Sequence, residues 1–177
     1  MIILGIDPGM ANVGYGVVSK IRSRKSKGQS KLKCLGYGVI QTSPNFNSAE
    51  RLKKLNNELS KLIKKYQPNV LAMENVYFFK NLKTAVPVSQ AEGVILLTAA
   101  KKKIPVREFT PLQVKSAITG FGWAEKARVQ KKLKKIFCLK EIPKSDDATD
   151  ALAIALTYFL KEGKTLDKTS WKSIISP

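Results

Sequence analysis

The sequence opens with MIILGIDPGMANVGYGVV (residues 1–18), which predicts two strands joined by a tight turn. The apolar run from Ile2 to Ile6 is typical of a buried strand, and it ends at a carboxylate, Asp7, before a Pro-Gly turn. Apolar residues then alternate with glycines, so we expect the second strand to return antiparallel to the first. A carboxylate at this buried position is costly unless it is paired or holds a cation. The alternative is that Asp7 only caps the turn.

The composition favours a polyanionic partner. The chain has 32 Lys and Arg residues against 13 Asp and Glu residues, a formal net charge of +19. Nucleic acid is the polyanion that we favour, and the alternative is a solvated surface in a lysine-rich proteome. The sequence has no long apolar span that would cross a membrane and no signal-peptide pattern, so we expect a cytoplasmic protein without a membrane partner.

Cysteine and histidine usage limits the available chemistry. Cys34 and Cys138 are far apart in apolar patterns, which is typical of reduced cysteines that pack in the core of a cytoplasmic protein. Histidine is absent, so carboxylates, lysines and hydroxyls must carry out any catalysis.

The rest of the chain predicts an α/β fold with a mixed five-stranded sheet flanked by helices. Strands and helices alternate in the middle of the sequence, which implies parallel crossovers. Further strands are expected over 32–42, 70–73 and 104–109, and helices over 48–66 with Ser48 as its cap, 87–102, 111–119, 124–137 and 145–160. At 177 residues, the length suits one domain, which we place at 1–162, and we expect a flexible tail at 163–177.

Four carboxylates stand out in this framework. Glu74 ends the strand at 70–73, as Asp7 ends the first strand, while Asp147 and Asp150 are one helical turn apart and share a face. Asp146 and Asp147 could simply cap the helix that begins there. Capping does not explain Asp150, which is in the apolar body of the helix.

Convergence of these four carboxylates would create a site for hard divalent cations. Mg²⁺ and Mn²⁺ prefer oxygen ligands and need no histidine. Two ions roughly 3.5 to 4 Å apart could activate water and stabilise the leaving oxygen of a phosphodiester. In a basic protein this chemistry predicts a nuclease.

Five blocks of sequence resemble one family. In order, they are GIDPG (5–9), ENVYF (74–78), SQAEG (89–93), LQVKSAITGFGWAEKARVQ (112–130) and DATDALAIA (147–155). Together they resemble the RuvC-type Holliday junction resolvases over residues 2–159. The resemblance implies a ribonuclease-H-like fold, a homodimer, and Mg²⁺-dependent symmetric cutting of a four-way DNA junction. It suggests two Mg²⁺ ions per site, with Mn²⁺ as a substitute, and the RuvA–RuvB branch-migration complex as a partner.

The resemblance also implies the role of each acid. Asp7, Glu74, Asp147 and Asp150 would be the catalytic, metal-binding residues. The family pattern D-x-x-D-A-L selects Asp147 over Asp146.

Three further positions match DNA-contacting residues of the family. Tyr77 falls where the family has an aromatic that stacks on junction bases, and the alternative is core packing. Lys115 and Lys126 match basic residues near the scissile phosphate, where they could stabilise developing charge. The alternative is that both lysines are merely solvated.

Two features depart from the family pattern but leave the acids intact. The basic stretch 20–33, either a DNA contact or a solvated loop tip, is longer than expected, and Pro87 lies where the family has an uninterrupted helix start. The apolar helix over 87–102 is either a dimer surface or buried within one subunit.

We therefore expect an endonuclease that resolves Holliday junctions in recombination and repair and leaves 5′-phosphate and 3′-hydroxyl ends. One alternative is a related nuclease that acts on other branched DNA or on an RNA–DNA hybrid. A second is a non-catalytic junction-binding protein, which would not need four acids. A third, an actin-like or sugar-kinase-like ATPase, is disfavoured because the sequence has no room for a second phosphate-binding lobe.

Overall fold

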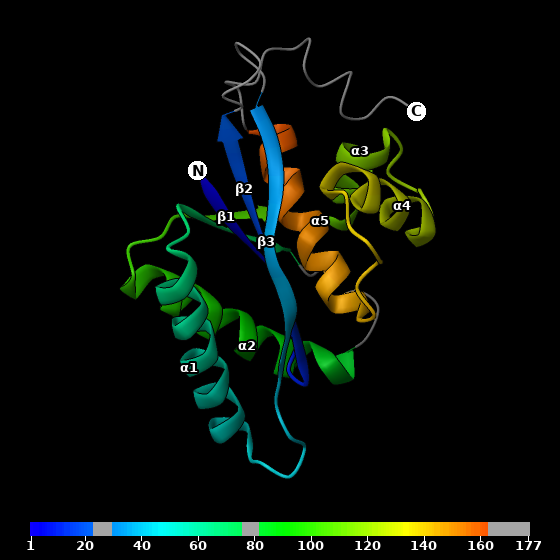
Figure 1. Cartoon of the computed structure of the whole chain (residues 1–177). Coiled ribbons are helices and arrows are strands. Elements are labelled where there is room, and N and C mark those ends of the chain that lie inside the picture. Colours follow the sequence, from blue (N-terminus) through cyan, green and yellow to red (C-terminus); the bar gives the residue numbers. More distant parts are fainter. Residues whose placement is uncertain (23–29, 76–81, 163–177) are drawn as a thin grey trace.

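The structure is a computed structural model that describes residues 1–22, 30–75 and 82–162. These residues form a five-stranded sheet with the strand order β3-β2-β1-β4-β5. The strands are β1 (Ile2–Asp7), β2 (Asn12–Arg22), β3 (Ser30–Gln41), β4 (Val70–Glu74) and β5 (Val106–Phe109). β2 is antiparallel to β1 and β3, whereas β4 is parallel to β1 and β5. The predicted mixed sheet is confirmed (Figure 1).

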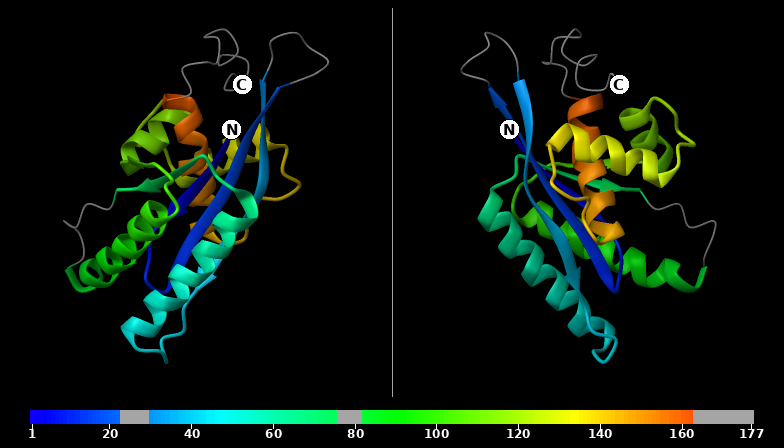
Figure 2. Two further views of the ribbon diagram at one scale, coloured as in Figure 1. Left: turned by 90° about the vertical axis from the view of Figure 1, so that its left-hand side faces the viewer. Right: turned by 45° about the vertical axis from the view of Figure 1, so that its right-hand side comes forward.

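Helices in the described residues cover both faces of this sheet. They are α1 (Ser48–Tyr66), α2 (Leu82–Lys101), α3 (Pro111–Thr119), α4 (Lys126–Phe137) and α5 (Asp146–Lys161). α1 and α2 cover one face, while α5 crosses the other face with α3 and α4 beside it (Figure 2). The sheet is therefore the middle layer of three.

The apolar run in β1 is explained by these two layers. Ile3 packs in the cluster under α5, whereas Leu4 and Ile6 pack in the cluster under α1 and α2. Successive side chains of a strand point to opposite faces, so a strand with both faces covered must be apolar throughout.

Pro87 does not begin a helix, contrary to expectation. It lies inside α2, which starts at Leu82. Proline lacks the N–H that would donate to the carbonyl of residue 83, and this loss makes it a good first-turn residue but a poor interior one. The prediction applied this rule, and the helix nevertheless continues through Pro87.

Other predicted element ends shift by one or two residues. The cap of α1 is Asn47 and not Ser48, because the Asn47 side chain accepts from the Glu50 N–H in a capping box. β5 begins at Val106, two residues later than predicted, and α4 begins at Lys126, two residues later. α3 begins as predicted, with Thr110 as its cap.

The two cysteines differ in their surroundings. Cys34 is half-buried, but Cys138 is exposed at the end of α4, so the expected core packing is wrong for Cys138. No helix within the described ranges has the length and apolar character needed to cross a membrane. Tyr77, the predicted tail 163–177 and much of the basic stretch lie outside the described residues.

Candidate active site

Two of the predicted acids end neighbouring parallel strands. Asp7 is the last residue of β1 and Glu74 is the last residue of β4. Ile6 and Met73 are partners in the β1–β4 ladder, so the two acids that follow them emerge at the same edge of the sheet. The parallel pairing therefore brings together two residues that are distant in the sequence.

The other two acids reach this edge because α5 packs unusually close to the sheet. Gly14 is the ladder partner of Asp7, and a Cβ at Gly14 would lie 2.0 Å from the carbonyl oxygen of Asp147. Likewise, a Cβ at Gly5 would lie 2.1 Å from the carbonyl oxygen of Ala151. Glycine at these positions lets the first turns of α5, which carry Asp147 and Asp150, lie directly against β1 and β2.

The electrostatics of Asp7 reflect this convergence. Its pKa rises from 3.8 to about 8, chiefly because the carboxyl group is buried. Glu74, Asp150 and Asp147 each raise the pKa further by repelling the charged form, and Lys126 lowers it. The other three predicted acids therefore all lie close enough to Asp7 to disfavour its charged form.

Glu74 behaves in the same way. Burial, followed by repulsion from Asp150, raises its pKa from 4.5 to about 7, while Lys115 and Lys126 lower it. Glu74 and Asp150 line a cleft of about 250 Å³ together with Lys115 and Lys126. The two predicted phosphate-contacting lysines thus face the same space as two of the acids.

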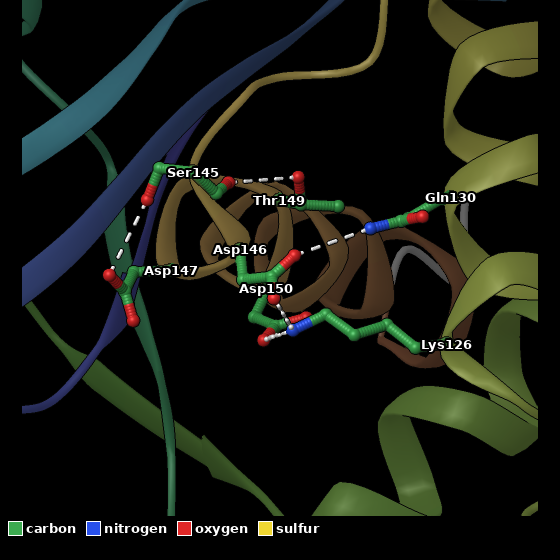
Figure 3. A network of polar contacts seen from close by, with 7 residues as sticks. All are labelled: Lys126, Gln130, Ser145, Asp146, Asp147, Thr149 and Asp150. Atoms are coloured by element: carbon green, nitrogen blue, oxygen red, sulfur yellow. Dashed lines mark hydrogen bonds and ion pairs between the residues drawn. The ribbon is translucent and has the colours of Figure 1, made fainter.

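Lys126 joins α4 to the acidic end of α5 (Figure 3). Its Nζ donates to Asp150 Oδ2 at 2.9 Å and lies 3.3 Å from Asp146 Oδ2. Although partial burial lowers the pKa of Lys126, hydrogen bonds and attraction from Asp150 and Asp146 raise it above its usual value. Asp147 points away from this ammonium group (Figure 3).

Asp146 has a role that the sequence did not reveal. The sequence indicated Asp146 only as a possible helix cap, yet its carboxylate pairs with Lys126 and accepts from Gln130 Nε2 at 3.4 Å. The four-residue spacing of Asp146 and Asp150 was the available indication, because such residues lie on one helix face. The spacing could not identify the lysine that both acids share.

A second network holds the turn that follows Asp7. The Thr42 hydroxyl donates to the Met10 carbonyl and accepts from Arg51 Nε at 2.9 Å, and the Thr42 N–H donates to the Ala11 carbonyl at 2.9 Å. The end of β3 and helix α1 therefore fix the turn between β1 and β2. No local pattern in the sequence indicated this contact.

The donor set fits a hard divalent cation. In the part of the chain that the structure describes, no three carboxylate or thiol groups are already arranged as a metal site. However, the side chains that raise the pKa of Asp7 by repelling its charge supply only carboxylate oxygens. A bound cation would relieve this repulsion, and oxygen is the ligand that Mg²⁺ and Mn²⁺ prefer.

Comparison with known proteins gives one consistent family. The family model described as "Crossover junction endodeoxyribonuclease RuvC" matches residues 3–158. A protein of that name from Caldicellulosiruptor saccharolyticus is 45% identical over 166 residues, which are 94% of this chain and 96% of the relative.

Solved structures agree with this match. The Thermus thermophilus RuvC structure superimposes with a TM-score of 0.83 and 33% identity, covering 94% of this chain and 98% of that chain. T. thermophilus RuvC in complex with a Holliday junction substrate also has a TM-score of 0.83 and 33% identity, covering 92% of this chain and 94% of that chain. The ribonuclease-H-like fold that the sequence predicted is thereby confirmed.

Proposed function

Because this chain belongs to the RuvC family of crossover junction endodeoxyribonucleases, we propose that it is a metal-dependent enzyme that resolves Holliday junctions. The proposed reaction is paired, symmetric hydrolysis of two strands in a four-way DNA junction during recombination and repair. Each cut would leave a 5′-phosphate and a 3′-hydroxyl end that a ligase can rejoin.

The observation that carries this proposal is the convergence of three acids on a fourth, Asp7, in a strongly basic chain. Asp7 has a pKa of about 8 because burial and three other acids, Glu74, Asp150 and Asp147, disfavour its charge. A protein of net charge +19 attracts polyanions, so a phosphodiester can approach despite the local negative charge. A cluster of this kind has no evident purpose in a protein that only binds DNA.

We propose that Asp7, Glu74, Asp147 and Asp150 hold the metal, Mg²⁺ with two ions per site, and that Mn²⁺ can replace it. When bound, the metal supplies charge neutralisation and an activated water for attack on phosphorus. The carboxylates bind in their charged form, so the raised pKa values of Asp7 and Glu74 should make metal binding stronger as the pH rises.

The lysines act on the phosphate. Lys115 and Lys126 line the cleft that also contains Glu74 and Asp150, where an ammonium group can orient a non-bridging phosphate oxygen. The same positive charges would stabilise the additional negative charge that develops in the transition state. Tyr77 stays a predicted base-stacking residue in this proposal.

We further propose that two copies of the chain form a homodimer. A two-fold axis relates two equal sites in such a dimer, which is a simple way to cut opposed strands symmetrically. The exposed apolar side chains Val86, Leu96 and Leu97 of α2 are available for such an interface. The RuvA–RuvB complex is a proposed partner by family resemblance.

A cleavage assay with a synthetic four-way junction tests this function. We expect wild-type protein to cut the junction symmetrically with Mg²⁺, and Asp7→Asn to be at least about a hundredfold slower, because one metal-binding carboxylate is lost. Binding of the junction by Asp7→Asn should persist. Ligation of the nicked products measures the end chemistry, and linear duplex of the same sequence is the control substrate.

Equal cleavage by the two proteins would refute the assigned site. Faster cleavage of an RNA–DNA hybrid or another branched DNA than of the four-way junction would instead favour the alternative nuclease. Binding without metal-dependent cutting would favour the non-catalytic alternative.

A further inference from the structure

An exposed aromatic pair lies in the connection between α3 and α4. Residues 120–123, Gly-Phe-Gly-Trp, are hereafter the aromatic loop. Phe121 is 53% exposed and Trp123 is 75% exposed, and the neighbouring Leu112 of α3 is 46% exposed. Large apolar side chains that gather on the surface of a soluble protein usually mark an interaction site.

The aromatic loop has a defined conformation. The Thr119 hydroxyl donates to the Phe121 carbonyl at 2.9 Å and accepts from the Phe121 N–H at 3.1 Å. Gly120 has a φ of 80°, which ends α3 in a left-handed cap, and the Ala124 N–H donates to the Phe121 carbonyl at 3.2 Å. These hydrogen bonds hold the backbone that carries Phe121 and Trp123.

The aromatic loop borders the cleft of the candidate active site. Gly122 packs on Leu112, since a Cβ at Gly122 would lie 3.3 Å from the Leu112 carbonyl oxygen, and the adjacent Pro111 lines the cleft. At the other end, Trp123 precedes the cleft residue Lys126 by only three positions. Their Cα atoms therefore lie within about 11 Å of each other.

The charges around the aromatic loop suit DNA. Lys115 and Lys126 flank it on α3 and α4, and the exposed Arg128 follows. Glu125 is the one acid among residues 111–135. Flat apolar rings beside cationic side chains are the surface that proteins use to hold unpaired or unstacked bases next to a phosphate backbone.

We propose that Trp123 and Phe121 contact the DNA strand beside the scissile phosphate, with Trp123 stacking on a base. This inference rests on the proposed function, because it assumes that DNA enters the neighbouring cleft. DNA is favoured over a second copy of the chain because the cationic side chains that flank the aromatic loop, Lys115, Lys126 and Arg128, complement the negative charge of a phosphate backbone.

Tryptophan fluorescence tests the contact directly. The chain has two tryptophans, so Trp171→Phe leaves Trp123 as the single tryptophan, whose emission can be excited selectively over that of tyrosine. This variant is titrated with a four-way junction in a buffer whose chelator removes divalent metal, so that the DNA is not cut. Binding is followed in parallel by the fluorescence anisotropy of labelled DNA. Quenching of Trp123 emission in parallel with binding supports stacking, whereas unchanged emission at saturation overturns the proposal.

Substitutions in the otherwise natural chain provide an independent measurement. Trp123→Ala should weaken junction binding about tenfold, Trp123→Phe should restore much of the affinity, and Trp123→Leu should not, because leucine retains apolar bulk without a flat ring. Wild-type affinity of Trp123→Leu would overturn stacking. Loss of dimers in sedimentation of Trp123→Ala would assign the aromatic loop to a protein interface instead.

Cleavage with Mg²⁺ separates this proposal from the proposed function. Junction binding with Trp123 quenching but no cutting would refute the enzymatic function and leave the stacking contact in place. Cutting without quenching of Trp123 would support the enzymatic function and refute the stacking contact. A chain that binds no junction would overturn both.

Discussion

The charged form of Asp7 is unfavourable in its surroundings unless a cation is bound nearby. Its carboxyl group is mostly buried, and Glu74, Asp150 and Asp147 all repel its charged form. Lys126 opposes this effect, but its ammonium group is hydrogen-bonded to Asp150 and paired with Asp146. The protein alone therefore does not neutralise the acids completely.

This conflict predicts a pH-dependent stability. Asp7 has a pKa of about 8 in the folded protein and 3.8 ordinarily, so between these values the folded state keeps a proton that the unfolded chain releases. The free energy of unfolding therefore falls as pH rises through this window. Without divalent metal, we expect a loss on the order of 1 to 3 kcal/mol between pH 5 and pH 8, measured by urea denaturation.

Asp7→Asn provides the comparison for this measurement. Asparagine does not titrate, so the loss between the two pH values should shrink, although Glu74 still contributes because its pKa is about 7. Mg²⁺ should stabilise wild-type protein more at pH 8 than at pH 5. An undiminished loss in Asp7→Asn would show that Asp7 does not cause it.

At the scale of elements, the site depends on how closely α5 approaches β1 and β2. The backbone of α5 occupies the space where Cβ atoms of Gly5 and Gly14 would lie. The buried alanines Ala151 and Ala155 make the matching surface on the helix. Small residues on both elements therefore set the depth at which the acids of α5 are held.

Glycine substitutions test this packing. Gly14→Ala should lower the free energy of unfolding by about 2 to 4 kcal/mol, because its Cβ would meet the Asp147 backbone and α5 would have to move. Gly93→Ala in α2 is the matched control, since its Cβ would meet nothing within 4 Å. It should stabilise the protein by about 0.5 to 1 kcal/mol through helix propensity.

Denaturation of both variants measures the difference. Equal stability of Gly14→Ala and wild type would mean that α5 does not need this close approach. Destabilisation by Gly93→Ala would mean that another surface, such as a second subunit, covers this part of α2.

For the whole molecule, the distribution of charge is the dominant property. The chain as a whole has a net charge of +19, whereas its candidate active site is built from acidic side chains. The positive surface would attract the DNA backbone, and the acids would then need metal ions for the phosphate to come close. Attraction at long range and catalysis at short range thus use charges of opposite sign.

This arrangement predicts a steep dependence of junction binding on salt. The logarithm of the binding constant should fall linearly with the logarithm of salt concentration. Loss of one phosphate contact should make this negative slope less steep by about 0.9. We expect this reduction for Lys115→Met, measured by anisotropy with a four-way junction. Lys61→Met, which removes a lysine paired with Glu58 on α1, should keep the wild-type slope. The same slope for both variants would argue against a Lys115–phosphate contact.

Local chemistry made several parts of this protein predictable from sequence. The β1–β2 hairpin and the start of α3 follow from residues that are close in the chain, as does the step from strand to carboxylate at Asp7 and Glu74. The N-cap of α1 was less predictable, because Asn47 and Ser48 are both residues that cap helices well. The reciprocal hydrogen bonds between Asn47 and Glu50 select Asn47. The interior position of Pro87 was missed because tertiary packing can outweigh a local preference.

The amino-acid sequence by itself determined the types of functional group, the net charge and the strand ends that carry two acids, because these depend on composition and short-range periodicity. Only the tertiary structure decided that Lys126 joins Asp146 to Asp150 and that Thr42 holds the turn after Asp7. These contacts connect distant segments, and their existence depends on the register of the sheet and the depth of α5. Such long-range geometry follows from packing of the whole chain and is not encoded in any local pattern.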